Sequence, residues 1–445
     1  MKKVCVIGLG YIGLPTAILA AQSGFEVVGV DINEDRVAGV NAGKAVIEES
    51  ELVPRLKKVL EAKTLRATAV YEQADCFIIA VPTPFTDDKK ADLSYVFAAA
   101  GALSGVIKKG DLIILESTVP VGTTTILAQY VANKTGLQVG VDFFVAHCPE
   151  RVLPGNIFHE LQVNDRVIGG IDRLSTRQAA LFYKHFVSGD LYLTTCQAAE
   201  MAKLIENSYR DVNIAFAHQV ASMAYAVNLD PYEVIELANK HPRVNILRPT
   251  CGVGGHCLAV DPWFLVETFP TQTTLLKEAR LVNDAKPFEV VERIDKKISS
   301  WKDAFNKKTC NILVLGATYK PNVDDLRESP AVTIINELLQ RKDYVVQVCE
   351  PHVTAARLQE VTKACTVDFK EGIRTADIIV CLVAHNEFKN IEKTVIAHKK
   401  ILDFCGLLHI ARKASIDQEQ LFWAEQINND SFVSASFTKI QEIAS

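Results

Sequence analysis

The first 31 residues place a glycine-rich loop between two short apolar runs, and this arrangement restricts the possible folds more than any other feature of the chain. Residues 4–7 are apolar and rich in β-branched side chains, and Gly8-Leu9-Gly10-Tyr11-Ile12-Gly13 follows directly. Residues 14–23 have a helical composition, and a second apolar run over residues 27–30 ends at Asp31. This order of strand, loop, helix and strand predicts a βαβ unit with a parallel sheet, and hence an α/β fold.

The loop has the spacing that a dinucleotide-binding unit requires. Its first glycine permits a tight turn, its second lets the backbone approach a pyrophosphate, and its third allows the helix to pack closely. Asp31 lies 18 residues beyond the last glycine, where its carboxylate would accept hydrogen bonds from a ribose diol and repel a ribose phosphate. The pattern therefore favours NAD over NADP. Arg36, close behind that acid, is either a further contact to the cofactor or an ordinary charge on a helix surface.

Composition limits the class of protein. The chain has 445 residues, 49% of them hydrophobic, which is enough for large cores and two to three domains. Its net charge of −5, with both signs mixed, gives no basic stripe, so no nucleic-acid partner is expected. No apolar stretch reaches the roughly 18 residues of a membrane span, and no signal-peptide pattern is seen. The 11 scattered cysteines indicate free thiols, and we expect a cytoplasmic protein with no membrane partner.

A cysteine in the segment Gly252–Pro262 is the strongest candidate for chemistry. Cys257 follows a run of glycines, which we expect to be flexible, and precedes Asp261 by four residues. A thiol that can hold an acyl group, together with a cofactor that accepts hydride, indicates oxidation of an alcohol through an aldehyde and a thioester to an acid. The alternative to a catalytic role is that Cys257 is a buried cysteine that packs as a small apolar side chain. No metal site is predicted, because paired C-x-x-C spacing is absent among Cys148, Cys251, His256 and Cys257.

Polar residues follow three further apolar runs, which predict strands of the same sheet. These runs cover residues 76–81, 112–116 and 143–146. Thr83 and Thr118 follow the first two runs, and Glu150 follows the third. Ligands bind beyond the carboxyl ends of parallel strands, so these side chains are candidates for contacts to the cofactor or the reacting group. A hydroxyl at such a place also serves as a helix cap, and for Thr118 both roles remain open.

The middle of the chain has a helical sequence pattern, unlike the alternating strands and helices before it. Residues 198–225 form a proline-free helical pattern, on which Glu200, Lys203 and Asn207 share one face. This face is either a solvated row of charges with a Glu–Lys pair or, because it includes an asparagine, part of a polar site.

From about residue 307 the chain repeats the order of its start. Strands are predicted at residues 312–315 and 345–348, the second ending at Glu350. The loop after the first of them lacks the glycine spacing but carries Lys320 and Arg327, two cations that suit a phosphate or carboxylate. We therefore expect a second, degenerate nucleotide-binding unit.

These segments occur in the order found in the UDP-glucose/GDP-mannose dehydrogenase family, which the chain resembles over about residues 1–410. The matching segments are the glycine loop, Ser117–Pro120, Cys148–Arg151, Glu200–Asn207, Gly252–Pro262 and Lys320–Pro330. The resemblance implies two Rossmann-like doubly wound domains joined by a central helical dimerisation region. On this basis residues 1–195 would bind NAD, residues 196–300 would form the central domain with the dimer contact and the active site, and residues 301–445 would bind the UDP-sugar.

The resemblance also implies residue roles. Cys257 would attack the intermediate aldehyde, while Lys203 and Asp261 would organise water and stabilise the oxyanion. The implied catalytic residues are Cys257, Lys203, Asp261, Asn207, Thr118 and Glu150. The expected cofactor contacts are Gly8, Gly10, Tyr11, Ile12, Gly13, Asp31, Arg36, Thr83, Thr118 and Arg327. The implied substrate contacts are Glu150, Arg151, Lys203, Asn207, Arg243, Asn245, Gly254, His256 and Lys320. Arg243 would reach the substrate of the neighbouring subunit in a homodimer.

The substrate implied by the resemblance is a UDP-N-acetyl-hexosamine. His256 and Ala259-Val260 depart from the UDP-glucose branch of the family, where a serine and Pro-Lys stand at these places. Within the N-acetyl-hexosamine branch, residues 148–155 and 241–247 favour UDP-N-acetyl-D-mannosamine, with UDP-N-acetylglucosamine and UDP-N-acetylgalactosamine as alternatives. The product would be a uronic acid for bacterial surface polysaccharides. A two-electron hydroxyacid dehydrogenase and a non-catalytic NAD-sensing protein are alternatives from other classes, and neither would need Cys257.

Overall fold

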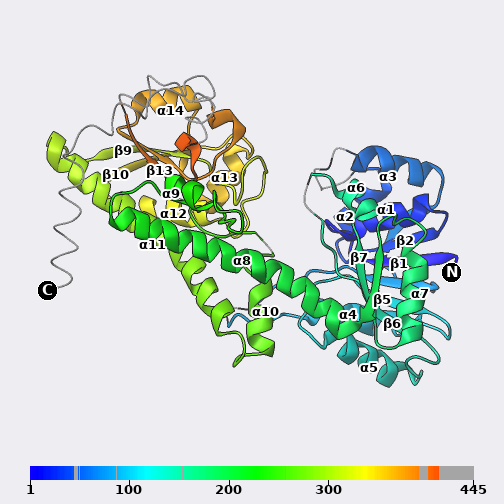
Figure 1. The fold of residues 1–445 in the computed structure, drawn as a ribbon. Helices are drawn as coiled ribbons and strands as arrows, with labels where there is room; N and C mark the ends of the chain where they lie inside the picture. Colours follow the sequence, from blue (N-terminus) through cyan, green and yellow to red (C-terminus); the bar gives the residue numbers. More distant parts are fainter. Residues whose placement is uncertain are drawn as a thin grey trace. The chain divides into compact units, whose positions relative to one another are not determined.

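The computed structural model describes residues 1–44, 49, 51–86, 88–152, 155–255, 257–389 and 399–409. These residues form two compact units (Figure 1). The first unit comprises the described residues of Met1–Ala215 and His256–Val282, and the second those of Phe216–Gly255 and Asn283–Ser445. Each unit contains one sheet flanked by helices, which confirms the predicted α/β class with two Rossmann-like parts.

The first unit contains an eight-stranded sheet in the order β3-β2-β1-β4-β5-β6-β7-β8. Its strands are β1 (Lys3–Ile7), β2 (Glu26–Val30), β3 (Leu65–Thr68), β4 (Cys76–Ile79), β5 (Leu112–Leu115), β6 (Phe144–His147), β7 (Arg166–Gly170) and β8 (Leu191–Thr195). All neighbours are parallel except β6 and β7. The strand order reverses at β1, which lies between β2 and β4, and dinucleotides bind at such a switch point.

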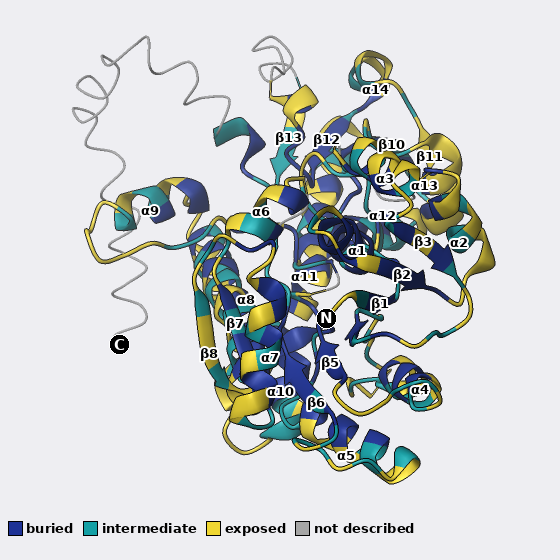
Figure 2. Ribbon diagram, turned by 90° about the vertical axis from the view of Figure 1, so that its right-hand side faces the viewer, coloured by how far each residue is buried: buried dark blue, intermediate teal, exposed yellow. Residues whose placement is uncertain are grey.

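Helices cover both faces of this sheet. They are α1 (Gly13–Gln22), α2 (Glu34–Asn41), α3 (Leu52–Glu61), α4 (Ser94–Leu103), α5 (Thr123–Thr135), α6 (Ile157–Val163) and α7 (Arg173–Tyr183). Side chains of β1 alternate between the two resulting cores: Val4 and Val6 pack with residues of α1, α3, α6 and α7, whereas Cys5 and Ile7 pack with α4 and α5. Most strands are buried, whereas β8 at the sheet edge is largely exposed (Figure 2).

The second unit contains a five-stranded parallel sheet in the order β11-β10-β9-β12-β13. Its strands are β9 (Cys310–Leu315), β10 (Tyr344–Cys349), β11 (Cys365–Thr366), β12 (Ile378–Cys381) and β13 (Lys400–Asp403). The other elements are α9 (Pro231–Ala238), α12 (Pro330–Leu339), α13 (Ala355–Thr362), α14 (Phe369–Thr375) and the 3-10 turn η1 (Asn386–Phe388). The strand, loop, helix and strand order of the first unit is therefore repeated, as predicted.

Two long helices contribute residues to both units. Helix α8 (Cys196–Ala226) has 31 residues and matches the predicted helix over 198–225 closely. Helix α11 (Thr274–Phe305) has 32 residues and includes Pro287, and the shorter α10 (Asp261–Thr268) precedes it. Neither of these two was predicted. In the part of the chain that the structure describes, no helix is both long and apolar enough to cross a membrane.

Candidate active site

The glycine loop between β1 and α1 has the shape that a pyrophosphate requires. Gly8 has a φ of 93°, and a Cβ there would lie 2.6 Å from the carbonyl oxygen of Ala80, just beyond β4. A Cβ at Gly13 would lie 1.9 Å from the carbonyl oxygen of Gly8. A Cβ at Gly10, in contrast, would meet no atom within 4 Å. Gly8 and Gly13 are therefore needed for packing inside the unit, whereas Gly10 leaves room for a ligand to approach the backbone.

Asp31, directly after β2, lies against this loop. Its Oδ2 accepts hydrogen bonds from the backbone N–H of Leu9 and from Nη1 of Arg36, both at 2.9 Å, and its Oδ1 accepts one from the N–H of Asn33 at 3.0 Å. Arg36 is thus an ion-pair partner of the acid rather than an isolated surface charge. No side chain caps the N terminus of α1, and no acidic residue lies in its first turn. Helix N termini of this kind attract phosphate, so these residues fit NAD.

Other predicted cofactor residues have partners inside the first unit. The Tyr11 hydroxyl donates to Glu49, and Ile12 is the N-cap residue of α1. The Thr83 hydroxyl donates to the carbonyl oxygen of Thr118 at 2.7 Å, which joins the loops after β4 and β5. Among the described residues, the Thr118 hydroxyl itself has no hydrogen-bond partner, so it caps no helix there. This leaves the Thr118 side chain available for a ligand.

Four predicted catalytic residues gather around the start of α10. The side-chain Nδ2 of Asn207, on α8, donates to Oδ2 of Asp261 at 2.5 Å. The N–H of Asp261 donates to the carbonyl oxygen of Cys257 at 2.8 Å, so these two residues lie one helical turn apart. The Cys257 residue is exposed at the beginning of this turn, whereas six other cysteines in or beside strands are buried or half-buried. Lys203 lies one turn before Asn207 on the same helix.

The electrostatics of this group suit acid–base chemistry near neutral pH. Asp261 is 3% exposed, and its burial raises the pKa of the carboxyl to about 6, against the opposing influence of the Lys203 charge and the Asn207 hydrogen bond. Lys203 is 9% exposed, and within the described part of the chain it makes no hydrogen bond and no ion pair shorter than 4 Å. A cation that makes no direct ion pair can stabilise a developing oxyanion, and a carboxylate with this pKa can accept a proton.

Glu150 is held by a buried cation that the sequence did not point to. Nη1 of Arg166 lies 3.2 Å from Oε2 of Glu150, and both side chains are nearly buried. The guanidinium of Arg166 also lies 4.9 Å from the ring centre of Tyr183, whose hydroxyl donates to Oε1 of Glu116 at 2.6 Å. Burial raises the pKa of Glu116 to about 7. Arg166 lies in none of the motifs recognised in the sequence, which is why its pairing with Glu150 was not predicted.

The buried side chain of Glu200 has a structural role. Its carboxylate accepts hydrogen bonds from the N–H of Gly122 at 2.6 Å and from the N–H and hydroxyl of Thr124 at 2.7 and 2.6 Å. It therefore caps the N terminus of α5 from helix α8. Because Glu200 and Lys203 are both buried, the alternative of a solvated row of charges is wrong. Arg151 is tied to the same helix through an ion pair with Glu206 at 2.7 Å.

The glycines before Cys257 serve close packing, not flexibility. Gly252 and Gly255 have φ values of 151° and 84°, and a Cβ on either would lie within 3 Å of Pro330 or Tyr319, respectively. A Cβ at Gly254 would lie 2.3 Å from the carbonyl oxygen of Glu328. The expectation of a flexible run was therefore wrong, because the backbone here lies directly against the loop between β9 and α12. His256, a predicted substrate contact, lies outside the described residues.

The remaining predicted ligand contacts belong to the second unit. Lys320 is half-buried, with Nζ 5.5 Å from the ring centre of Tyr319. Arg327 binds Asp325 through Nε at 2.9 Å and Nη2 at 2.7 Å. Arg243 and Asn245 are exposed. The roles of these residues remain predictions.

Comparison with known protein families identifies the family of this chain. Three models of one family match consecutive parts: its NAD binding domain matches residues 2–187, its central domain 197–285 and its UDP binding domain 313–410. The chain belongs to the UDP-glucose/GDP-mannose dehydrogenase family. It is accordingly an NAD-dependent nucleotide-sugar dehydrogenase, and the NAD expected from the glycine loop and Asp31 is confirmed.

Individual members of the UDP-glucose/GDP-mannose dehydrogenase family are similar over nearly their whole length. A UDP-N-acetyl-D-mannosamine dehydrogenase from Campylobacter jejuni is 45% identical over 414 residues, which cover 91% of this chain and 99% of that protein. An NDP-N-acetyl-D-galactosaminuronic acid dehydrogenase from Ralstonia nicotianae is 43% identical over 423 residues, 93% and 98% of the two chains. The solved structure of a UDP-D-ManNAc dehydrogenase from Pyrococcus horikoshii superimposes with a TM-score of 0.83 at 38% identity, covering 91% and 96%.

Proposed function

We propose that this enzyme oxidises the primary alcohol of UDP-N-acetyl-D-mannosamine to the carboxylate and so forms UDP-N-acetyl-D-mannosaminuronate. The observation that carries the reaction type is the exposed Cys257 at the start of the turn that also holds Asp261 beside Asn207. The choice of sugar is supported by the similar proteins from C. jejuni and P. horikoshii, which are named for this substrate.

UDP-N-acetylgalactosamine is the second candidate substrate. The R. nicotianae protein named for N-acetyl-D-galactosaminuronic acid is 43% identical to this chain, against 45% for the C. jejuni protein. N-acetyl-hexosamines differ only in the orientation of ring substituents, so a few contacts decide between them. UDP-N-acetylglucosamine remains a further alternative of the same kind.

The first oxidation converts the C6 alcohol to an aldehyde. NAD, when bound, accepts the hydride that leaves the carbon in each of the two oxidations. We assign assistance in removing the hydroxyl proton to Thr118 and Glu150, and Arg166 fixes the position of the Glu150 carboxylate. Asn207 and Lys203 donate hydrogen bonds to the same oxygen of the substrate. Donors of this kind stabilise the negative charge that develops when the proton leaves.

The second oxidation depends on Cys257. Its sulfur adds to the aldehyde carbon, the carbonyl oxygen takes up a proton, and a thiohemiacetal results. Loss of that proton and of a hydride from the carbon gives a thioester. Asp261, with its pKa near 6 from burial, is mostly ionised at neutral pH and activates the water that cleaves the thioester. Hydrolysis releases the acid and restores the thiol, while Lys203 stabilises the oxyanion.

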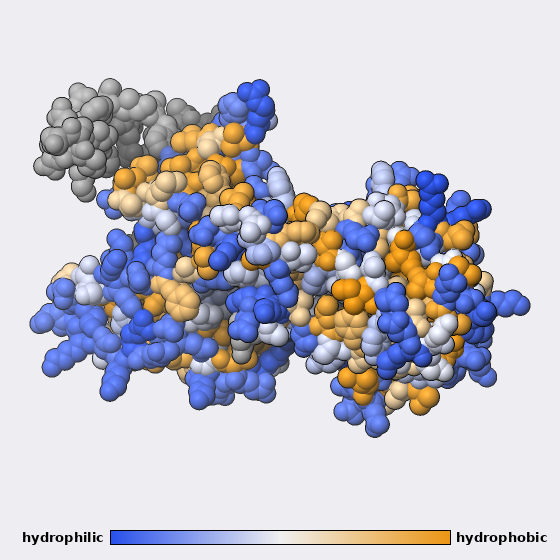
Figure 3. Space-filling model, turned by 90° about the horizontal axis from the view of Figure 1, so that it is seen from below, coloured by the Kyte–Doolittle hydropathy of each residue, from blue (hydrophilic) through white to orange (hydrophobic). Residues whose placement is uncertain are grey.

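We also propose a cytoplasmic homodimer built on helix α8. Exposed apolar side chains recur along this helix at spacings of four and seven residues, at Ile205, Tyr209, Phe216 and Met223, and the exposed Val227 follows directly after its end. Figure 3 shows hydrophobic residues interspersed with hydrophilic ones on one face of the molecule. An exposed apolar stripe on one helix suits a helix–helix interface between two copies. Free cysteines suit a reducing compartment. Sedimentation of the protein and of Tyr209→Glu would test the dimer, because a charge on the stripe should yield monomers.

The test of the function is NADH formation with UDP-ManNAc, UDP-GlcNAc, UDP-GalNAc and UDP-glucose. The proposal expects kcat/KM for UDP-ManNAc to exceed the others by about tenfold or more. A preference for UDP-GalNAc would select the second candidate, and a preference for UDP-glucose would contradict both. Cys257→Ser is the matched control: it should still bind NAD and the nucleotide sugar, yet form no acid.

A further inference from the structure

The second unit contains a buried polar network at the ends of its central strands. Glu350 follows β10, and its side chain is fully buried. Its Oε2 accepts hydrogen bonds from the N–H of Ala317 at 2.7 Å and of Thr318 at 3.2 Å. This repeats the first unit, where Asp31 follows β2 and binds the N–H of Leu9. The partner of the acid differs, however: Asp31 pairs with a partly exposed arginine, whereas Glu350 pairs with the fully buried His385.

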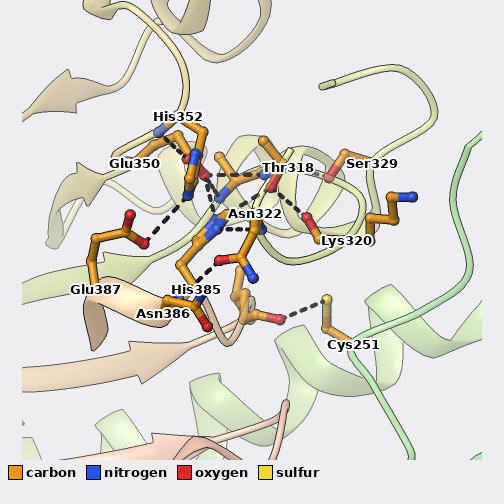
Figure 4. A network of polar contacts seen from close by, with 12 residues as sticks. Cys251, Thr318, Lys320, Asn322, Ser329, Glu350, His352, His385, Asn386 and Glu387 are labelled. Carbon is orange, nitrogen blue, oxygen red and sulfur yellow. Dashed lines mark hydrogen bonds and ion pairs between the residues drawn. The ribbon is translucent and has the colours of Figure 1, made fainter. Parts of the chain in front are cut away.

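The hydrogen bonds around His385 define its protonation. Nδ1 of His385 lies 3.0 Å from the backbone N–H of Asn322, so Nδ1 must be the acceptor and carries no proton. Nε2 therefore carries the hydrogen of the neutral ring. It lies 3.1 Å from Oε2 of Glu350 and 3.3 Å from Oγ1 of Thr318. Figure 4 shows the ring between Glu350, Thr318 and Asn322.

These contacts hold the chain on both sides of Lys320. The Thr318 hydroxyl, which lies 3.3 Å from Nε2 of His385, donates its hydrogen to the carbonyl oxygen of Lys320 at 2.9 Å. Asn322, two residues beyond Lys320, has a φ of 60° and is bound through its N–H to Nδ1 of His385. The side-chain oxygen of Asn322 also accepts from the N–H of Asn386 at 2.9 Å. A left-handed backbone is costly for most residues, and these contacts compensate for it.

A metal ion is a poorer explanation of this cluster. Among the described residues, His352, His385 and Glu387 place possible ligand atoms within 4.8 Å of one another. Both ring nitrogens of His385 are already used, one by Asn322 and the other by Glu350 and Thr318. His385 could therefore bind a metal ion only if it gave up its hydrogen bonds to the loop that carries Lys320.

We infer that His385 and Thr318 are positioning residues for Lys320: they fix the backbone of Lys320 so that its ammonium meets the nucleotide sugar. The inference rests on the proposed function and on the substrate contact that the family resemblance implies for Lys320. Neither His385 nor Thr318 touches the substrate in this account, because both are buried beneath the loop. The backbone contacts already restrict the conformations of Lys320 before the substrate binds. Less conformational entropy is then lost on binding, which is the general basis of preorganisation.

The experiment compares Thr318→Val with Thr318→Ser. The valine variant keeps the size of the buried side chain but cannot donate to the carbonyl oxygen of Lys320, whereas the serine variant keeps the hydroxyl. The loss of one hydrogen bond should raise KM for UDP-ManNAc roughly two- to tenfold in the valine variant, with kcat and KM for NAD nearly unchanged. The serine variant should behave like the unchanged enzyme. Equal KM values for the sugar nucleotide in both variants would overturn the inference.

Lys320→Ala separates the inference from the proposed function. If Lys320 binds the substrate, this variant raises KM for UDP-ManNAc by itself, and Thr318→Val adds nothing further in its presence. Independent, multiplying effects of the two changes would overturn the positioning role while leaving Lys320 as a substrate residue. An unchanged KM in Lys320→Ala would instead refute the substrate assignment on which the inference rests.

His385→Asn and His385→Gln provide a second route if the valine variant does not fold. An asparagine oxygen can take the place of Nδ1 and accept from Asn322, whereas a glutamine amide can reach the place of Nε2 and donate to Glu350. Each variant keeps one of the two contacts that hold the loop. Each should raise KM for UDP-ManNAc, and the effect should vanish in the Lys320→Ala background. KM values that stay at the level of the unchanged enzyme in both variants would overturn the inference.

Discussion

The buried ion pair of Arg280 and Asp211 gives a sharp prediction about the cysteine turn. The pair joins α11 to α8, its atoms Nη1 and Oδ1 are 2.5 Å apart, and the two side chains are 0% and 1% exposed. Nη1 of Arg280 also lies 3.4 Å from the carbonyl oxygen of Leu258, the residue after Cys257. Arg280→Met would leave the Asp211 carboxylate buried without this cation and would free the turn that carries the thiol.

The expected effect follows from the cost of a broken buried pair. Removing one partner typically costs about 3–5 kcal/mol, because an uncompensated charge remains in the interior. With an unfolding entropy of about 2.1 cal/mol/K per residue over the 445-residue chain, a loss of this size corresponds to a fall in the thermal midpoint of roughly 3–5 °C. Replacing both partners with apolar residues, in Asp211→Leu with Arg280→Met, should recover most of the lost stability. Arg280→Met and the double variant should both have a lower kcat than the unchanged enzyme, because neither retains the guanidinium that donates to the carbonyl oxygen of Leu258.

Thermal unfolding and steady-state kinetics of the two single variants and the double variant provide the assay. The reasoning predicts that the double variant melts well above Arg280→Met but turns over slowly. A double variant as unstable as the single ones would refute the electrostatic explanation of stability. A normal kcat in Arg280→Met would refute the link between this pair and the cysteine turn.

Three further predictions follow from the first unit. Gly10→Ala should keep the thermal midpoint but raise KM for NAD, whereas Gly13→Ala should lower the midpoint, because only the second Cβ meets protein atoms; equal midpoints would contradict this. Asn207→Ala should shift the acid limb of the pH–rate profile from about pH 6 to higher pH, because the lost hydrogen bond is one that lowers the pKa of Asp261. An acid limb that stays in place would show that it does not report the titration of Asp261. Burial raises the pKa of Glu116 to about 7, so the native state binds more protons than the unfolded state between about pH 4.5 and 7, and stability should fall as pH rises through this window. In Glu116→Gln, the thermal midpoint should not show this decrease between pH 5 and pH 8.

The sequence predicted those parts of the fold that local patterns control. The glycine spacing before α1, the apolar runs of β1, β2, β4 and β5, and the long helix α8 were all found near their predicted limits. Strands β7 and β8 were not predicted. In β8, Tyr192 and Leu193 are exposed at the sheet edge, so the strand lacks an alternation of apolar and polar residues. Helix α11 was missed because Pro287 and many charges obscure its pattern.

The site was predictable where chemistry requires a particular residue, and not where partners are distant in sequence. Cys257, Asp261 and Asn207 were singled out from the sequence and lie together in the structure. The capping role of Glu200 depends on Gly122 and Thr124, which lie more than 70 residues earlier. No local signal relates such positions, because burial and backbone geometry decide which donor meets which acceptor.

The central claim is that Cys257 carries the sugar through a thioester, so that each substrate molecule loses four electrons. The most direct test is the total NADH formed from a limiting, known amount of UDP-ManNAc in excess NAD. The account predicts two NADH per sugar nucleotide and the uronic acid as the only sugar product, with none of this acid formed by Cys257→Ser. One NADH per sugar nucleotide, with aldehyde accumulating, would contradict it.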